Sequence, residues 1–392
     1  MKTNVLTVIS ICSCIIIYSN VKAQWVQQNS NSFDVLFGNY FTSANTGFLV
    51  GENGVIRKTT NGGTNWSGVA SGTTSALIGI HFFNSNVGCI VGNVGTVLTT
   101  TNGGTNWTSQ VSGTVNSLES VYFTSIDTGF AVGALGTLLR TVNGGVTWTS
   151  TAIVPEGLKC INFPSSSVGY VVSEAGSILK TIDGGNSWVV STVPYALSGV
   201  SFATVDTGYI CGAPGIVAKT TDGGLTWNAQ STGTLEYLRT VDFIYSSYGF
   251  AAGENGTIIN TTDGGNTWTS QVTGTAFGLW CINFPTATTG YASGGIGYVC
   301  KYSGVAGVIE TDLTNSIDIY PNPGTGIISL KFNTKNNIQS EIYNVMGEKL
   351  LSINRVIPEE AIILDLSTFS KGTYFVKFSD GVSSGTKKLV LQ

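Results

Sequence analysis

A short string built on Asn/Asp-Gly-Gly and closed by Trp occurs six times in this chain. The intervals between its tryptophans are 41, 41, 40, 39 and 41 residues. The tryptophans are Trp66, Trp107, Trp148, Trp188, Trp227 and Trp268. A fixed period of this length is typical of a supersecondary unit that cannot bury its apolar face alone and must stack on copies of itself. The chain is therefore predicted to be a repeat array.

Each repeat unit reads as four short antiparallel strands. Its segments are rich in Val, Ile, Thr and aromatic residues, which favour a pleated, half-buried surface. Gly and Asn between them supply the positive φ angles of tight hairpins. Helical periodicity is absent throughout, so the predicted fold class is all-β.

The repeated string, called the box below, is interpreted as a structural turn. Its Asn or Asp is expected to accept hydrogen bonds from turn amides, and its Trp to cover the neighbouring strand. The six acceptors are Asn61, Asn102, Asn143, Asp183, Asp222 and Asp263. A calcium site is the alternative, and the three uncharged Asn side chains make it less attractive. No metal and no cofactor are predicted.

The chain is predicted to contain seven units. A last pattern begins at Leu279 and stops after Ser303, without its box or final strand. Trp25 lies 41 residues before Trp66 and is followed by residues similar to those after Trp107. We expect this N-terminal strand to complete the last unit. The prediction for residues 24–303 is a closed seven-bladed β-propeller, without open sheet edges between its ends.

Two segments carry a family resemblance. VGENGVIRKTTNGGTNW and AAGENGTIINTTDGGNTW resemble the Asp-box (bacterial neuraminidase, BNR) repeat proteins, most closely the photosystem II assembly and stability factor family. The likeness covers about residues 25–303 and implies the propeller fold. It does not specify a function, because such propellers include sialidases, xyloglucanases, sorting receptors and assembly factors.

The N-terminus is predicted to be a secretory signal over residues 1–23. Lys2, an apolar core from Val5 to Tyr18, and Ala23 follow the order of charge, hydrophobe and small residue that such signals show. Cys12 and Cys14 leave a lipoprotein signal as the alternative. No other stretch is long and apolar enough to span a bilayer, so the mature chain is expected to lack a transmembrane segment.

A different unit follows the repeats. Residues 304–316 read as a linker, and residues 317–392 as a small C-terminal β-sandwich. The strings YPNP, YNVMGEKL, DLS and GTYFVK occur there in that order. This segment resembles the type A sorting domain of type IX secretion cargo in the Bacteroidetes. The resemblance implies that the type IX machinery is a partner and that the protein reaches the outer cell surface or the medium. An ordinary adhesion sandwich is the alternative.

The charge pattern excludes one class of partner. Only 10% of the residues are charged, and residues 24–303 contain eight basic against thirteen acidic side chains, without basic clusters. Nucleic-acid binding is therefore not expected. Five cysteines remain after removal of the signal, and they are interpreted as buried free thiols in a monomer. They are Cys89, Cys160, Cys211, Cys281 and Cys300.

Two columns of the repeat could carry chemistry. If the first strand of each unit lines the axis, the residue before each Phe points into a channel, either as a wet polar lining or as a catalytic ring. These residues are Tyr40, His81, Tyr122, Asn162, Ser201, Asp242 and Asn283. The second column starts the same strand and differs most between repeats: Phe37, Ile78, Glu119, Lys159, Ser198, Arg239 and Trp280.

The second column is predicted to surround the channel mouth on the side opposite the boxes. Glu119, Lys159, Arg239 and Trp280 are the candidate ligand-binding residues, because repeat positions that differ can serve recognition. A glycan or a surface protein is the expected ligand. Ordinary solvated loops are the alternative interpretation.

Three functions are considered. The first is a secreted or surface-displayed, non-enzymatic binding or adhesion propeller. The second is an Asp-box glycoside hydrolase that uses Glu119 and Asp242 as its two carboxylates. The third is a structural or assembly factor. A sialidase arginine triad cannot be transferred, because Arg57 and Arg140 lie on the strand that leads to a box.

Overall fold

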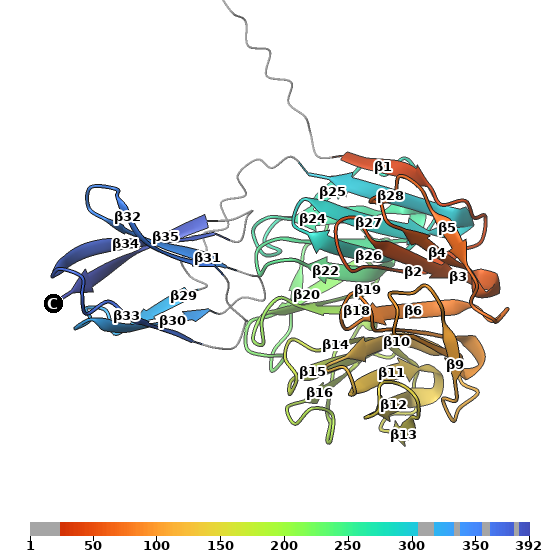
Figure 1. Ribbon diagram of the computed structural model, residues 1–392. Helices are drawn as coiled ribbons and strands as arrows, with labels where there is room; N and C mark the ends of the chain where they lie inside the picture. Colours follow the sequence, from red (N-terminus) through yellow and green to blue (C-terminus); the bar gives the residue numbers. More distant parts are fainter. Residues whose placement is uncertain (1–23, 305–316, 333–337, 355–360, 380–383) are drawn as a thin grey trace, which may run out of the picture.

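The computed structural model describes residues 24–304, 317–332, 338–354, 361–379 and 384–392. Over these ranges the protein is all-β, with short 3-10 turns (Figure 1). None of the described segments forms a helix that is long and apolar enough to cross a membrane. The predicted signal, residues 1–23, and residues 305–316 of the predicted linker lie outside the described residues.

Residues 24–303 form seven four-stranded antiparallel sheets. Sheet 1 is β2(Leu36–Phe41), β3(Gly47–Gly51), β4(Ile56–Thr59) and β5(Ser67–Val69). Sheet 2 is β6(Leu77–Phe82), β7(Gly88–Gly92), β8(Val97–Thr100) and β9(Thr108–Gln110). Sheet 3 is β10(Leu118–Phe123), β11(Gly129–Gly133), β12(Thr137–Thr141) and β13(Thr149–Ala152). Sheet 4 is β14(Leu158–Asn162), β15(Gly169–Ser173), β16(Ser177–Thr181) and β17(Val189–Thr192).

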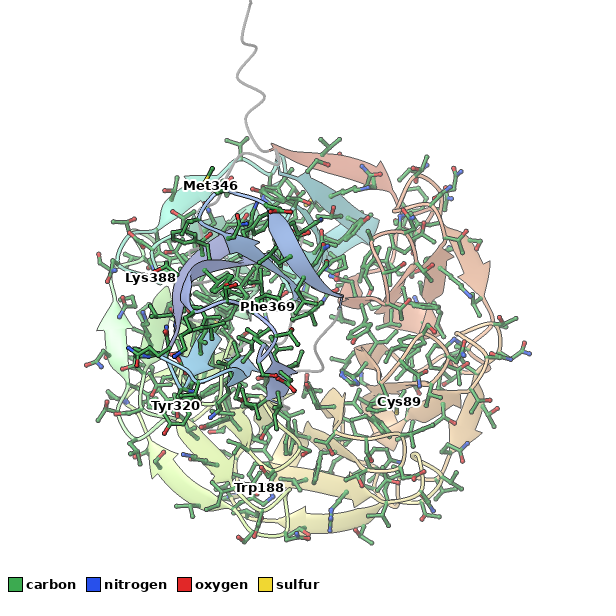
Figure 2. The ribbon with its side chains drawn as sticks, turned by 60° about the vertical axis from the view of Figure 1, so that its left-hand side comes forward. Cys89, Trp188, Tyr320, Met346, Phe369 and Lys388 are labelled. Atoms are coloured by element: carbon green, nitrogen blue, oxygen red, sulfur yellow. The ribbon has the colours of Figure 1, made fainter. Side chains whose placement is uncertain are left out.

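Sheet 5 is β18(Ala196–Phe202), β19(Gly208–Ala213), β20(Ile216–Thr220) and β21(Asn228–Gln230). Sheet 6 is β22(Leu238–Phe243), β23(Gly249–Gly253), β24(Ile258–Thr261) and β25(Thr269–Gln271). Sheet 7 is β26(Leu279–Thr286), β27(Thr289–Gly294), β28(Tyr298–Ser303) and β1(Gln24–Asn29). The sheets are arranged around a common centre (Figure 2).

Aromatic rings hold neighbouring sheets together. At six of the seven interfaces, a ring from the second strand of one sheet stacks on the Phe near the end of the first strand of the next, with centroids 3.4–4.9 Å apart. Cys89 replaces the ring between sheets 2 and 3. In all seven sheets a Trp packs edge-on against the same Phe at 5.8–6.1 Å. Each Phe is therefore buried between its own sheet and the preceding one.

A second set of contacts joins the first strands, which lie nearest the axis. Each of the seven residues predicted to line the channel bonds to the backbone of the Phe in the next sheet. Five accept a hydrogen bond from its N–H: His81, Asn162, Ser201, Asp242 and Asn283. Tyr40 and Tyr122 instead donate to its carbonyl oxygen. The polar column thus serves cohesion between sheets, a role that the sequence analysis did not foresee.

The two ends of the repeat array meet in sheet 7. Strand β1 pairs antiparallel with β28 along its whole length, from Gln24 opposite Ser303 to Asn29 opposite Tyr298. Trp25 is buried there and contacts Phe250 of sheet 6. The first strands of sheets 7 and 1 are also joined, because the Asn283 amide oxygen accepts the Phe41 N–H at 3.1 Å.

Deletion of residues 24–31 is expected to destabilise the whole array. It removes the outer strand of sheet 7 and the buried Trp25, and loss of a buried Trp side chain alone typically costs about 3–5 kcal/mol. Thermal unfolding of the truncated and intact mature chains measures the effect. Val26→Ala, at an exposed position of the same strand, is the control. An unchanged melting temperature in the truncated protein would contradict the closing role of β1.

The described residues after 316 form two further sheets. One contains β29(Ile317–Tyr320), β30(Ile327–Phe332) and β33(Ile362–Asp365). The other has the order β32(Lys349–Asn354), β31(Gln339–Asn344), β34(Gly372–Ser379), β35(Ser384–Leu391). Both sheets contribute to one apolar core, since Ile328 and Leu330 pack in the same cluster as Ile342, Val376 and Phe378. This segment therefore has a core of its own.

Candidate functional site

The two ends of the sheets carry different structures. Each first strand has a Leu near its start, beside a Gly-x-x-Gly turn (Ser-x-x-Gly in sheet 4). Near its end is a Phe, which in sheets 1–6 lies beside a box. We call the side with the Gly-x-x-Gly turns and the connections between sheets the mouth face. The opposite side, with the boxes, is called the box face.

A β-bulge positions the variable residues of the mouth. In every sheet the pairing of the first two strands shifts register directly after the first Leu, as between Leu118 and Ser120. The extra residue is in each case the variable one. These seven, the mouth column, are Phe37, Ile78, Glu119, Lys159, Ser198, Arg239 and Trp280. Because a bulge re-aims a side chain, the column faces the axis beside its small neighbours.

The mouth column surrounds one pocket of about 370 Å³. All four residues predicted to bind a ligand, Glu119, Lys159, Arg239 and Trp280, line it together with Tyr237. The strands approach closely below it. At Gly38, for example, an added Cβ would lie 2.5 Å from the Ile78 carbonyl oxygen, so larger residues are excluded. The pocket has the size and the mixed aromatic and charged lining of a small binding site.

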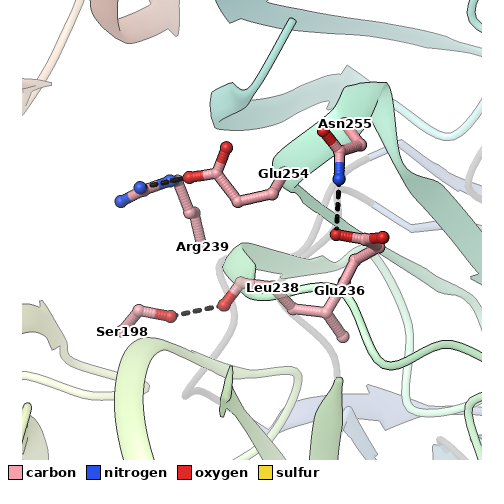
Figure 3. A network of polar contacts seen from close by, with 6 residues as sticks. All are labelled: Ser198, Glu236, Leu238, Arg239, Glu254 and Asn255. Carbon is pink, nitrogen blue, oxygen red and sulfur yellow. Dashed lines mark hydrogen bonds and ion pairs between the residues drawn. The ribbon is translucent and has the colours of Figure 1, made fainter. Parts of the chain in front are cut away.

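Arg239 is fixed between a carboxylate and two aromatic rings. Its Nε and Nη2 both donate to Oε1 of Glu254, the Nε bond being 2.6 Å long (Figure 3). The guanidinium carbon lies 3.6 Å from the Trp280 ring centroid and 5.0 Å from that of Tyr237. The Phe37 ring meets Trp280 edge-on at 5.1 Å. Trp280 and Arg239 therefore form a preorganised wall of the pocket.

The opposite wall carries a second ion pair and an additional carboxylate. Lys159 Nζ lies 2.9 Å from Glu174 Oε2. The Glu119 carboxylate forms no hydrogen bond or ion pair in the described part of the chain. Burial raises the pKa of Glu119 above its usual value; Lys159 acts in the opposite sense and Glu174 in the same sense. The pocket thus holds an incompletely satisfied acidic group beside a paired lysine.

On the box face, the Asn and Asp side chains of the boxes form hydrogen bonds within their own turns. The carboxylate of Asp183 accepts hydrogen bonds from the Ser187 N–H and hydroxyl at 2.9 and 2.6 Å, and these bonds hold its pKa at about 2. The Asn61 amide oxygen likewise accepts the Asn65 N–H at 2.9 Å. Four third-strand lysines cross to the next sheet, where each donates to a box-glycine carbonyl at 2.6–3.0 Å: Lys58, Lys180, Lys219 and Lys301.

His81 sits at the box-face end of the channel between two tyrosine rings. Its Nδ1 accepts the Phe123 N–H at 3.3 Å, and its ring centroid lies 4.4 Å from that of Tyr122 and 5.3 Å from that of Tyr40. Burial lowers the pKa of His81 to about 3. The imidazole is therefore neutral in the folded protein, as its acceptor role requires.

We expect His81 to make the protein sensitive to acid. The imidazole of His81 has a pKa of about 6.5 in the unfolded chain and about 3 in the folded protein. Between these pH values only the unfolded chain binds the proton, so the free energy of unfolding decreases as the pH falls through this window. His81→Asn keeps an acceptor, as Asn162 does in sheet 4, but removes the titration. Urea unfolding at about pH 7 and about pH 4.5 should show that the variant loses about 1–2 kcal/mol less than the wild type. Equal losses would contradict this.

The two carboxylates considered for hydrolysis do not share the pocket. Glu119 lines it, whereas Asp242 lies further along its strand and accepts the Phe284 N–H at 2.8 Å. In the described residues no group of three or more His, Cys, Asp or Glu side chains is arranged to hold a metal ion. The five cysteines are unpaired, and Cys160 and Cys281 line the pocket.

Three residues in or next to the pocket were not predicted from the sequence as part of the site. Tyr237, just before β22, and the turn residues Glu174 and Glu254 are not among the ligand-binding residues predicted from the sequence. Their spacing carries a signal, because each glutamate follows its cationic partner by 15 residues. That distance links the bulge residue of the inner strand to the turn that follows the second strand.

Two family models match the chain. Residues 318–392 match the secretion system C-terminal sorting domain, and residues 17–112 and 154–234 match the photosynthesis system II assembly factor YCF48. Both predicted resemblances are therefore confirmed. The matched tail indicates secretion to the cell surface or the extracellular space. No curated protein sequence is detectably similar to the chain.

Solved structures share the fold of residues 24–303. YCF48 from Cyanidioschyzon merolae has a TM-score of 0.63 at 19% identity, over 72% of this chain and 99% of its own. A structure of YCF48 bound to a D1 peptide has a TM-score of 0.62 at 20% identity, over 71% and 94%. The WD40 β-propeller domain of Doa1 has a TM-score of 0.62 at 10% identity, over 72% and 96%. These likenesses establish a propeller fold.

Proposed function

We propose that this secreted protein is a closed seven-bladed propeller, one blade per sheet, that binds another molecule at the cell surface without catalysing a reaction. The seven sheets, the β1–β28 pairing and the contact between sheets 7 and 1 support the blade count. The two C-terminal sheets with their common core support a sorting domain built as a β-sandwich.

The observation that carries the binding function is the pocket built from the bulge residues. The repeat keeps its packing positions alike, but the seven bulge positions differ in size, polarity and charge. They place an aromatic wall, a stacked arginine and an unsatisfied carboxylate around one opening. Such rigid aromatic and charged groups are typical anchors of recognition sites.

A peptide segment of a surface protein is favoured over a glycan as the ligand. One structure with this fold is that of YCF48 bound to a D1 peptide, so a propeller of this kind can hold a peptide. The hydrolase hypothesis receives less support, because Asp242 is engaged with the next sheet rather than with the pocket. An assembly role remains compatible with binding.

Trp280→Ala is expected to abolish ligand retention by removing the wall against which Arg239 and Phe37 pack. A buried aromatic anchor typically contributes 2 kcal/mol or more, which corresponds to a loss of about thirtyfold or more in affinity. The full-length chain is tested on peptide and glycan arrays, scored for both retention and loss of terminal sugars. Leu225→Ala, exposed on the box face, is the control.

Each result of the array experiment has a meaning. Retention that depends on Trp280 supports the binding function. Loss of terminal sugars that depends on Glu119 would replace it with the hydrolase hypothesis. Ligand retention that is unaffected by Trp280→Ala would show that the binding site lies outside the mouth.

The tail is proposed to direct export through the type IX machinery after the N-terminal signal has carried the chain into the periplasm. Deletion of residues 317–392 should leave the propeller in the periplasm, because the sorting signal recognised at the outer membrane is gone. Fractionation of a type IX-competent host, with Ile363→Ala as an exposed control in the same tail, measures the location. Export of the truncated protein would contradict the sorting role.

A further inference from the structure

Charge is divided unequally between the two faces of the propeller. Asp34 and all six glutamates of residues 24–304 lie on the mouth face, in the first strands, the Gly-x-x-Gly turns or the connections between sheets. Only two basic residues, Lys159 and Arg239, belong to this face. The remaining six lie on third strands, where four of them are bonded to box glycines. The mouth face is therefore strongly acidic.

The two cations of this face are already neutralised. Lys159 is paired with Glu174 and Arg239 with Glu254, while the other five carboxylates form no ion pair among the described residues. Of the three charged side chains that line the pocket, Lys159 and Arg239 are each paired with a glutamate of a neighbouring turn, whereas the Glu119 carboxylate forms no ion pair among the described residues. A positively charged group of a ligand could therefore pair with the Glu119 carboxylate.

Apolar side chains are exposed around the same face. Val94, Leu135 and Ile296 occupy the tips of Gly-x-x-Gly turns with φ of 56°, 53° and 51° and exposed fractions of 67%, 70% and 55%. Asn53 and Asn255 fill this position in sheets 1 and 6, as expected for a left-handed conformation that disfavours β-branched residues. Phe33 and Leu235, in connections between sheets, are exposed by 91% and 83%. Exposed apolar side chains thus share the turns and connections of the mouth face with most of its carboxylates, around a pocket that holds Glu119.

We propose that the mouth binds an extended cationic peptide segment of a partner protein, with one lysine or arginine side chain seated on Glu119 and apolar side chains of the segment covering the exposed turn tips. This inference rests on the binding function proposed above and names its ligand class. Charge complementarity selects the segment, since an acidic face attracts basic chains and repels acidic ones. The aromatic wall accepts the aliphatic stem of the incoming cation.

Three matched peptides test the ligand class with the full-length chain. They share their apolar residues and differ only in whether Lys, Glu or Ser occupies every third position. Fluorescence anisotropy should show the Lys peptide binding at least about tenfold more tightly than the others, with the advantage falling as salt is raised. Glu119→Gln should weaken the Lys peptide by about tenfold and leave the Ser peptide unchanged. Asp206→Asn, an exposed carboxylate on the box face, is the matched charge control.

A second set of variants separates binding from folding. Replacing Val94, Leu135 and Ile296 together by Asn should raise the melting temperature, because Asn tolerates the left-handed turn, while weakening the Lys peptide. A structural role of these residues alone predicts no loss of binding. Unchanged binding in the more stable variant would therefore overturn the apolar part of the proposal.

The remaining outcomes are distinct. The Glu or Ser peptide could bind as tightly as the Lys peptide in a Trp280-dependent manner, or a glycan could bind instead. Either result would overturn the cationic ligand but leave the binding function intact. Equal weakening by Glu119→Gln and Asp206→Asn would overturn the assignment to the mouth. Failure of every peptide and glycan to bind in a Trp280-dependent manner would overturn both proposals.

Discussion

The stacking of an aromatic ring of one sheet on the terminal Phe of the next is the contact on which the rest of the propeller depends. A four-stranded sheet exposes apolar groups on both faces, and only its neighbours can cover them. The same Phe meets a Trp edge-on, so one residue joins its own outer strand to the preceding sheet. An open array of such sheets would leave one apolar sheet face uncovered at each end. The pairing of β1 with β28 joins the two ends of the array in sheet 7.

The interface between sheets 2 and 3 shows how the contact tolerates change. Cys89 stands where the other sheets have Phe or Tyr, and it packs with Phe123 and Trp148 in one buried cluster. The His81 ring, stacked near Tyr122, lies at the same interface. His81 also bonds to the Phe123 backbone, as its counterparts do at the other interfaces. The polar bonds of the inner strands therefore persist where the aromatic stack is lost.

The proposed binding function uses the positions at which the repeat is least constrained. The bulge in each first strand releases one residue from the ladder and turns it towards the mouth, so it can vary without cost to packing. The proposed recognition site is thus assembled from seven independent positions, one in each sheet. The restriction of glutamates to this face, and of most cations to the box face, gives the ring two electrostatically different sides.

The sequence by itself determined the repeat, the all-β class, the strand that completes the last sheet and the candidate mouth residues, because period and alternation report directly on stacked strands. Only the tertiary structure decided what those residues touch. The channel column proved to bond between sheets, since each bond partner belongs to the next repeat. Asp242 accordingly bonds to Phe284 of sheet 7, outside the pocket that Glu119 lines. The pairing of Arg239 with Glu254, and its stacking on Trp280, likewise required the ring, which brings sheets 6 and 7 together.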